Sequence, residues 1–296
     1  MTQKNGVHGF LVVDKEPGMT SHDVVAIARR ALGTRKVGHA GTLDPMATGV
    51  LVLGFNNGTR LLQYITDGDK SYQATVVLGI STITDDFEGE VIATVDASTI
   101  TDTQIIAELD TMRGTFMQRP SSVSAVKVDG ERAYDRVRSG ENVVLTSREV
   151  TISQLEVLEI RHIEKRVEID IEVTCSAGTY IRAIARDCGD RLKVGGHLSA
   201  LRRTRVAGFT TSGAVSIDAL KSAEFSTLDL ADVARATFPV REIALDEKLE
   251  LSFGRTLKPN LGDGIFAGIS SANELIALLS NVDGKAKPIA VFAAAQ

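Results

Sequence analysis

The chain has 296 residues, a length at which about three quarters of the unfolded surface can be buried, so folding needs no disulfide or metal staple. It carries 33 Lys and Arg against 38 Asp and Glu, a formal net charge of −5 that excludes a histone-like or polybasic protein. Hydrophobic residues make up 43% and aromatic residues only 5%, with no Trp, so a broad base-stacking platform is disfavoured.

The two cysteines, Cys175 and Cys188, are too few for a disulfide framework and have no metal-ligand spacing. The N-terminal residues lack an apolar stretch of signal-peptide length, and no run approaches the roughly 18 apolar residues of a membrane span. We therefore expect a cytoplasmic protein with reduced thiols and no contact with a membrane.

The first elements predicted are a strand and a helix. Residues 9–14 form a short apolar run that is typical of a buried strand. Thr20 and Asp23 have the spacing of a capping box, which predicts a helix that ends near Leu32. The segment 38–58 is rich in glycine, so its backbone must bend sharply or approach another group closely.

Further along, residues 71–78 alternate as a strand does, and residues 101–112 have a helical period. The stretches 148–163 and 166–174 predict two paired strands, followed by a helix from about Thr179 whose apolar stripe places Cys188 in a core. Because these strands and helices have no repeating βαβ rhythm, we expect an α+β fold.

The C-terminal part has a different pattern. Three short strands are predicted at 264–268, 274–279 and 288–292, and the last two are joined through Asp283-Gly284, a hairpin signal. We therefore expect two domains, a large one at residues 1–238 and a small β-rich one at residues 239–296.

Sequence signatures of cofactor and metal chemistry are missing: there is no GxxxxGK[ST] loop, no HExxH helix and no CxxC pair. We therefore expect neither a cofactor nor a metal. What remains is the glycine-rich loop 38–49, which contains His39 and Asp44. An Asp before Pro commonly starts a turn, but a carboxylate held by such a loop can also act as base or nucleophile. His39 is either a hydrogen-bonding loop residue or a ligand contact. For both Asp44 and His39, the residues alone do not decide between a structural and a functional role.

Five motifs follow one another between residues 9 and 209: GFLVVDK with PGMTS, GHAGTLDPMATGVL, KSY, CSAGTYIR and GHLSALRR. Together and in this order they resemble the motifs of the TruB family of bacterial tRNA pseudouridine synthases. The resemblance implies a catalytic domain of the pseudouridine synthase type, built on a mixed, largely antiparallel sheet. It also implies a small C-terminal PUA-like domain that binds RNA.

The resemblance further implies a reaction. The T-loop uridine of tRNA (U55) is flipped out of its stack, its bond from N1 to ribose C1′ breaks, and the base rejoins the ribose through C5. Asp44 matches the catalytic aspartate, which either attacks C1′ or removes the C2′ proton; the sequence leaves both routes open. Arg182 matches the arginine beside this carboxylate, and Tyr72 matches the tyrosine that stacks on the base and assists proton removal at C5.

Other positions match substrate-binding residues of the family. Tyr180 and Leu201 match residues that line the uracil pocket, and Lys15 matches a residue near the pocket entrance. His39 matches the histidine that fills the gap left by the flipped uridine. We expect the partner to be the T-arm stem-loop of tRNA, bound by a monomer that requires no protein partner.

Two basic blocks flank these motifs in the sequence. Residues 29–44 contain four basic residues and one acid, and residues 180–205 contain seven basic residues and two acids. We expect them to form an RNA-facing patch, although a charge run is more often only a solvated face. The polar segments 82–90 and 119–142 are our candidates for movement, and Val123 stands where the family often has a tyrosine.

Three other functions compete with a tRNA pseudouridine synthase. The first is a tRNA-binding or tRNA-folding protein on the same fold without catalysis, and the second is a related synthase that acts within a guide-RNA complex. The third is a glycoside hydrolase, which is disfavoured because only one acid stands out where such enzymes pair two.

Overall fold

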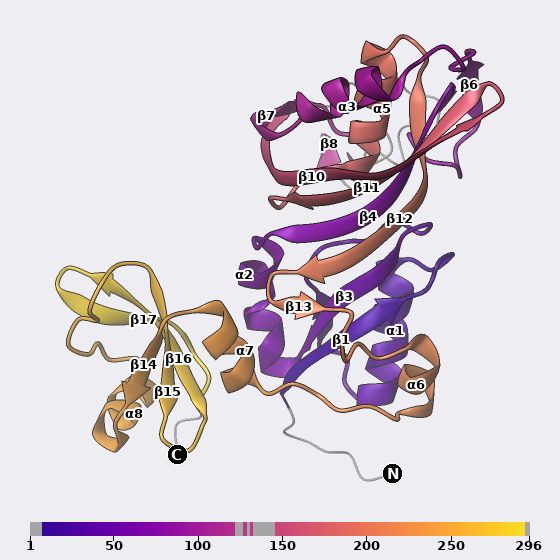
Figure 1. Cartoon of the computed structure of the whole chain (residues 1–296). Helices are drawn as coiled ribbons and strands as arrows, with labels where there is room; N and C mark the ends of the chain where they lie inside the picture. The colour runs from indigo at the N-terminus through magenta and orange to yellow at the C-terminus, as the bar shows by residue number, and fades with distance from the viewer. Residues whose placement is uncertain (1–7, 122–126, 129–130, 133–145, 294–296) are drawn as a thin grey trace.

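The computed structural model describes residues 8–121, 127–128, 131–132 and 146–293. Val123 and most of the segment 119–142 lie outside these residues. A long curved sheet forms the main body, and a smaller sheet is attached at one end, beside helix α7 (Figure 1). Within the described ranges, no helix is both long enough and apolar enough to cross a membrane.

The main sheet has nine strands in the order β1-β3-β12-β4-β11-β10-β7, with β2 paired to β3 and β13 paired to β12. All these pairs are antiparallel except β3 with β12, so the predicted α+β fold with a mixed, largely antiparallel sheet is confirmed. The strands are β1 (Gly9–Lys15), β2 (Val37–His39), β3 (Thr48–Phe55), β4 (Lys70–Leu78), β7 (Gly114–Gln118), β10 (Arg148–Ile163), β11 (Arg166–Cys175), β12 (Gly196–Val206) and β13 (Phe209–Thr210).

Strand β1 is buried on both faces, which explains its unbroken apolar run. Leu11 and Val13 belong to a core cluster on one face, and Phe10 and Val12 belong to a second cluster on the other. The first cluster packs the sheet against α1 (Ser21–Leu32), α3 (Asp102–Asp110), α5 (Ile181–Arg191) and α6 (Ile217–Ser222).

The predicted capping box at the start of α1 is confirmed. The Thr20 hydroxyl accepts from the Asp23 N–H at 3.1 Å, and the Asp23 carboxylate accepts from the Thr20 N–H at 2.8 Å. The Thr20 hydroxyl also donates to the Asp23 carboxylate at 2.7 Å, and this hydrogen bond together with that from the Thr20 N–H lowers the pKa of Asp23. The predicted helix at 101–112, the paired strands β10 and β11, and the buried position of Cys188 are confirmed as well.

The second core cluster joins the main sheet to the C-terminal sheet. It contains Phe10 and Val52 of the main sheet, Ala234 of α7 (Leu230–Thr237), and Ile269 and Leu278 of the C-terminal sheet. The C-terminal sheet has the order β14-β15-β16-β17, and its hairpin at Asp283-Gly284 was predicted from the sequence. The remaining elements are η1 (Asn56–Arg60), α2 (Leu62–Thr66), β5 (Ile80–Thr82), β6 (Val91–Thr94), β8 (Lys127–Val128), β9 (Glu131–Arg132), β14 (Val240–Ile243), α8 (Leu245–Ser252), β15 (Ile265–Ser270), β16 (Leu275–Val282) and β17 (Lys285–Val291).

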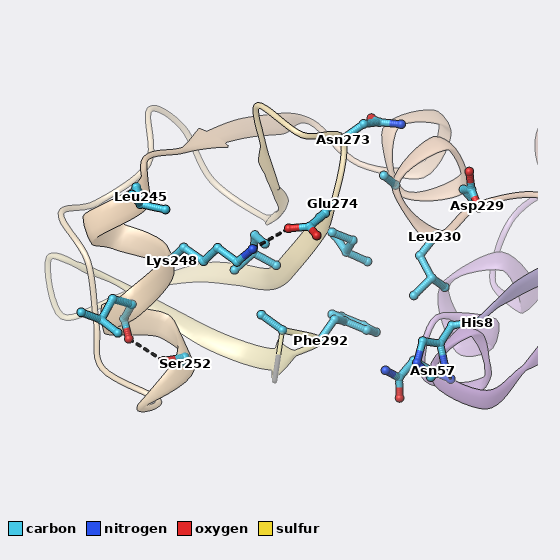
Figure 2. A pocket seen from close by; sticks show the side chains of 15 residues that line it. His8, Asn57, Asp229, Leu230, Leu245, Lys248, Ser252, Asn273, Glu274 and Phe292 are labelled. Atoms are coloured by element: carbon cyan, nitrogen blue, oxygen red, sulfur yellow. Dashed lines mark hydrogen bonds and ion pairs between the residues drawn. The ribbon is translucent and has the colours of Figure 1, made fainter. Parts of the chain in front are cut away.

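A cavity of about 860 Å³ lies between the C-terminal sheet and the end of the main body. Figure 2 shows Lys248 and Phe292 on one side of it and His8, Asn57 and Leu230 on the other. This interdomain cavity contains none of the site residues predicted from the sequence.

Candidate active site

A smaller cavity, of about 260 Å³, lies where the glycine-rich loop meets β4, β12 and the start of α5. This volume is just below the roughly 300–1,000 Å³ of pockets that enclose drug-sized ligands, so it suits a group of the size of one nucleobase. It brings together five of the seven predicted site residues, which are Asp44, Tyr72, Tyr180, Arg182 and Leu201.

The walls of this active-site cavity are strongly cationic. Asp44 is the one acidic residue that lines it, against the four basic residues Lys70, Arg148, Arg182 and Arg203. Such a charge balance favours a ligand with phosphate groups. The sequence analysis did not assign roles to Lys70, Arg148 or Arg203, although Lys70 and Arg203 lie within two of its motifs.

Two cationic side chains, Arg203 and Lys15, bind backbone carbonyls of the loop that carries Asp44. The Arg203 guanidinium donates to the carbonyls of residues 41 and 42 at 3.0 and 3.3 Å, and to that of Val50 at 2.8 Å. The Lys15 ammonium donates to the carbonyl of Pro45 at 3.1 Å. Because these carbonyls are fixed on both sides of Asp44, the backbone that presents the carboxylate has little freedom to move.

Ser21 and a glycine complete the support of the loop. The Ser21 hydroxyl accepts from the Leu43 N–H at 2.9 Å and donates to the Leu43 carbonyl at 3.2 Å. Gly49 has a φ of +101°, and a Cβ at this position would lie 2.1 Å from the carbonyl oxygen of Arg203. A side chain at residue 49 would therefore push the loop away from β12.

Asp44 forms an ion pair with Arg182, with 2.9 Å between Asp44 Oδ2 and Arg182 Nε. The Arg182 side chain is 4% exposed and the Asp44 side chain 34% exposed, so the carboxylate is the partner that faces the cavity. Arg182 Nη1 also lies 3.2 Å from Asp86 Oδ2 and donates to the Thr84 carbonyl at 2.7 Å. The guanidinium is thereby held at several atoms, which fixes its orientation toward Asp44.

The segment 82–90, a candidate for movement from its polar composition, is anchored instead. Asp85 and Asp86 are buried, and they pair with Arg186 at 3.1 Å and with Arg182 at 3.2 Å. Burial raises the pKa of Asp85, and the Arg186 guanidinium opposes this shift. The sequence shows the acidic pair but gives no sign that it faces two arginines of a helix about 100 residues later.

Tyr72 lies on β4, opposite Arg203 of β12, and is almost fully buried. Burial raises the pKa of its phenol to about 12, although the Arg203 guanidinium opposes the shift. The phenol is therefore neutral at pH 7. A neutral ring suits packing against a base, whereas acceptance of a proton would first require the disfavoured phenolate.

Tyr180 and Leu201 line the same cavity from other elements. Tyr180 is the residue before α5, and the Arg148 guanidinium carbon lies 4.6 Å from the centre of its ring. Leu201 lies on β12 and also lines a groove of about 550 Å³ on the open face of the sheet. Leu201 is therefore common to the linings of the active-site cavity and this groove.

Lys15 and His39 do not line the cavity. Lys15 is fully buried, and its ammonium donates to the carbonyl of Pro45 beside Asp44, so its place near the pocket entrance stays a prediction. Burial lowers the pKa of its ammonium to about 8. His39 lies half-buried at the end of β2, with its ring edge-to-face against His22 at 5.7 Å. Burial lowers the pKa of His39, so its ring is neutral at pH 7.

The expected basic patch is only partly exposed. In the block 180–205, Arg182 and Arg203 are buried, and Arg202 forms a bidentate pair with Asp14 at 2.7 and 2.9 Å. Arg182 and Arg203 act within the fold, whereas the side chain of Arg202 is 38% exposed. The exposed basic residues of the other block are Arg29, Arg30, Arg35 and Lys36. Among the described residues, His, Cys, Asp and Glu side chains form no cluster of three or more suited to hold a metal ion.

Solved structures share this fold. The chain superimposes with a TM-score of 0.72 and 23% identity on a protein of an H/ACA ribonucleoprotein bound to a substrate RNA, covering 97% of this chain and 86% of that one. A chain of a Cbf5–Nop10–Gar1 complex gives a TM-score of 0.70 at 24% identity, covering 97% and 85%. At this identity the likeness concerns the fold.

The sequence also matches described families. Residues 29–181 match the N-terminal domain of TruB family pseudouridylate synthases. Residues 182–245 match the C-terminal domain of tRNA pseudouridylate synthase B, and residues 238–293 match the C-terminal region of tRNA pseudouridine synthase II. The fold and the site are thus those of a pseudouridylate synthase, an isomerase.

Curated relatives narrow the class to one family. The chain is 50% identical to tRNA pseudouridine synthase B of Arthrobacter sp. (strain FB24), with 96% of both chains covered. It is 50% identical to that of Nocardia farcinica over 96% of this chain and 92% of the relative, and 49% identical to that of Corynebacterium glutamicum (strain R) over 92% and 91%. The chain belongs to the TruB family of pseudouridylate synthases.

Proposed function

We propose that this chain converts uridine 55 in the T-loop of tRNA to pseudouridine and that Asp44 is its catalytic carboxylate. The observation that carries the proposal is the pair of Asp44 and Arg182, 2.9 Å apart at a cavity with room for about one nucleobase. Membership of the TruB family supports the substrate, because its curated relatives act on tRNA.

The reaction needs one ionised carboxylate shielded from bulk water. The N1–C1′ bond breaks, the base turns, and a C5–C1′ bond forms, after which C5 loses its proton and N1 gains one. Asp44 begins this sequence either by attack on C1′ or by removal of the C2′ proton. The Arg182 guanidinium supplies the opposite charge that a carboxylate requires in a shielded site. Shielding also protects the detached ribose from capture by water.

Tyr72, Tyr180 and Leu201 hold the base during its turn. The three side chains come from β4, the start of α5 and β12, so they enclose the cavity from different directions. Burial keeps the phenol of Tyr72 neutral, with a pKa of about 12, and its ring packs against the uracil. The assistance of Tyr72 in proton removal at C5 stays a prediction.

The groove on the open face of the sheet provides the path for the RNA. It includes Thr48, Gln73 and Arg202, and it shares the lining residue Leu201 with the active-site cavity. A stem-loop lying in the groove delivers a base to Asp44 only if that base leaves its stack, since a cavity of about 260 Å³ has no room for the loop itself. We propose that His39, which lies outside the cavity, contacts the RNA left behind.

We also assign two domains, residues 1–238 for catalysis and residues 239–296 as a PUA-like accessory contact for tRNA. The start of β14 at Val240 supports this boundary. We further propose that the chain acts as a monomer without a protein partner. The buried free thiols of Cys175 and Cys188 support a reducing, cytoplasmic setting.

The test follows the proton that leaves C5. Unmodified tRNA labelled with tritium at uridine C5 is incubated with the wild-type protein, and tritium released to water is counted. We expect one tritium per tRNA to be released, and none from a tRNA with cytidine at position 55. Binding without release would instead support the tRNA-folding protein, and release only with an added guide RNA would support the guide-RNA synthase.

A further inference from the structure

The last residue of β7, Gln118, is a buried amide that contacts the peptide groups of one residue. Its Oε1 accepts from the Tyr180 N–H at 2.9 Å, and its Nε2 donates to the Tyr180 carbonyl at 3.0 Å. The residue is 1% exposed. A side-chain amide that pairs with both polar groups of one backbone residue reproduces the pairing of two β-strands, and it fixes that residue in position and in orientation.

Tyr180 is an unusual residue for the start of a helix. It occupies the N-cap position of α5, with φ −99° and ψ 110°, and its own side chain makes no capping hydrogen bond. Ser, Thr, Asp and Asn are preferred there because their short side chains bind the first N–H groups of the helix. A tyrosine gives up this stabilisation, and its ring instead lines the active-site cavity. Gln118 offsets part of the loss by binding the backbone of the cap residue.

A second contact comes from the strand beside β7. Arg148 is the cross-strand partner of Gln118, and its guanidinium both covers the Tyr180 ring and donates to the Gly178 carbonyl. Two paired residues at the end of β7 and β10 therefore hold the turn before α5, one through its peptide and one through the aromatic ring. Arg182, which pairs with Asp44, follows Tyr180 by two residues in the first turn of this helix.

We propose that Gln118 is a positioning residue for the isomerisation: it sets the Tyr180 ring against the flipped base and sets the first turn of α5, so that Arg182 meets Asp44. Gln118 does not line the cavity, and it acts through the backbone of Tyr180. This inference rests on the proposed function. It predicts that the chemical step depends on a side chain at the edge of the sheet that does not reach the substrate.

The principal variant is Gln118→Met, which keeps the length of the side chain and removes both hydrogen bonds. We expect the single-turnover rate constant for tritium release at saturating tRNA to fall by about 100-fold, because a misplacement of about 1 Å in a catalytic site has this effect. The dissociation constant for tRNA should stay within about threefold of wild type, because the groove is unchanged. The matched control is Gln154→Met on β10, whose exposed amide binds only Glu156, and we expect wild-type rates.

A second variant guards against misfolding. Gln118→Glu keeps the shape and the acceptor for the Tyr180 N–H but, when ionised, has no donor for the Tyr180 carbonyl. We expect it to fold and bind tRNA, and to lose at least about tenfold in the single-turnover rate constant. Circular dichroism and the urea midpoint establish that each variant is folded at the assay temperature.

The outcomes separate the two proposals. A loss of rate with tRNA affinity retained, in a folded variant, supports positioning by Gln118. A wild-type rate in both folded variants, or a loss of tRNA affinity with an unchanged rate at saturation, would overturn it. If the wild-type protein itself releases no tritium from tRNA, the proposed function has failed, and that failure is visible before any variant is compared.

Discussion

The molecule has two prominent cavities that differ in nearly every property. The interdomain cavity has a volume of about 860 Å³ and the active-site cavity about 260 Å³. The larger one is lined by exposed side chains such as Leu245 and Leu249, and its ion pair, Lys248 with Glu274, is solvent-exposed. The smaller one has Arg182, Arg203 and other buried charges in its walls.

The contrast indicates that a network of buried, hydrogen-bonded charges is a better sign of an active site than the volume of a cavity. The carbonyls around Asp44 accept hydrogen bonds from buried cations, and its ion-pair partner is 4% exposed. Buried charges are costly unless they are paired and hydrogen-bonded, so such a network is retained where it has a use. Among the residues that the structure describes, the lining of the interdomain cavity contains no comparable network of buried charges, and part of it belongs to the apolar core shared by the two sheets.

Apart from substitution of Asp44 itself, Arg182→Lys should give the largest loss of activity at the active-site cavity. Lysine keeps the charge but cannot contact Asp44, Asp86 and the Thr84 carbonyl with the spread of a guanidinium. We expect the single-turnover rate constant to fall by roughly 100-fold or more. Stopped reactions at saturating tRNA measure it, and a rate within about threefold of wild type would show that charge alone suffices.

Arg203→Met should reduce stability more than activity at saturation. The fully buried guanidinium donates to three carbonyls, and methionine leaves these carbonyls without that donor. We expect a loss of about 3 kcal/mol in the free energy of unfolding, measured by urea denaturation. Arg255→Met, at an exposed site, is the control and should change stability by less than about 0.5 kcal/mol. Equal losses in the two variants would contradict the role of Arg203.

Lys15 should give a smaller effect that depends on pH. The unfolded chain keeps the Lys15 proton up to a pKa of about 10.5, whereas burial lowers the pKa in the folded chain to about 8. Between these values folding releases a proton, so stability contributed through Lys15 rises with pH. We measure the urea midpoints of wild type and Lys15→Met at about pH 7.5 and about pH 9.5. The midpoint of wild type relative to that of the variant should therefore be higher at about pH 9.5 than at about pH 7.5. A constant difference would show that Lys15 keeps its ordinary pKa.

The smallest effect is expected from Lys248→Ala in the interdomain cavity. The side chains of this ion pair are 33% and 55% exposed, and exposed pairs contribute no more than about 1 kcal/mol. Tritium release from tRNA should stay within about twofold of wild type. A large loss of activity would mean that the larger cavity takes part in the reaction, and the contrast between the two cavities would fail.

The local elements of the fold could be predicted from the sequence, whereas contacts between residues far apart in the chain could not. The capping box of α1, the paired strands β10 and β11 and the buried Cys188 follow local periodicity. Asp44 and Arg182 were found as motif residues, but their 2.9 Å contact joins positions far apart in the chain.

The burial of charged residues could not be predicted from the sequence. The basic block 180–205 was expected to face the RNA, and Lys15 was matched through the family resemblance to a residue near the pocket entrance. Lys15 and Arg203 are instead buried and bound to backbone carbonyls, which no pattern of residue types reveals. Gln118 lies in none of the five motifs, and its pairing with the Tyr180 backbone depends on the order of strands in the sheet.

The central claim is that the Asp44 carboxylate performs the isomerisation, and Asp44→Asn tests it most directly because it removes the charge and keeps the shape. Pseudouridine at position 55 is measured in unmodified tRNA together with tRNA affinity. We expect the variant to bind tRNA within about threefold of wild type and to form no pseudouridine, a loss of roughly 1,000-fold or more in rate. Pseudouridine formation at a wild-type rate by the folded variant would contradict the account.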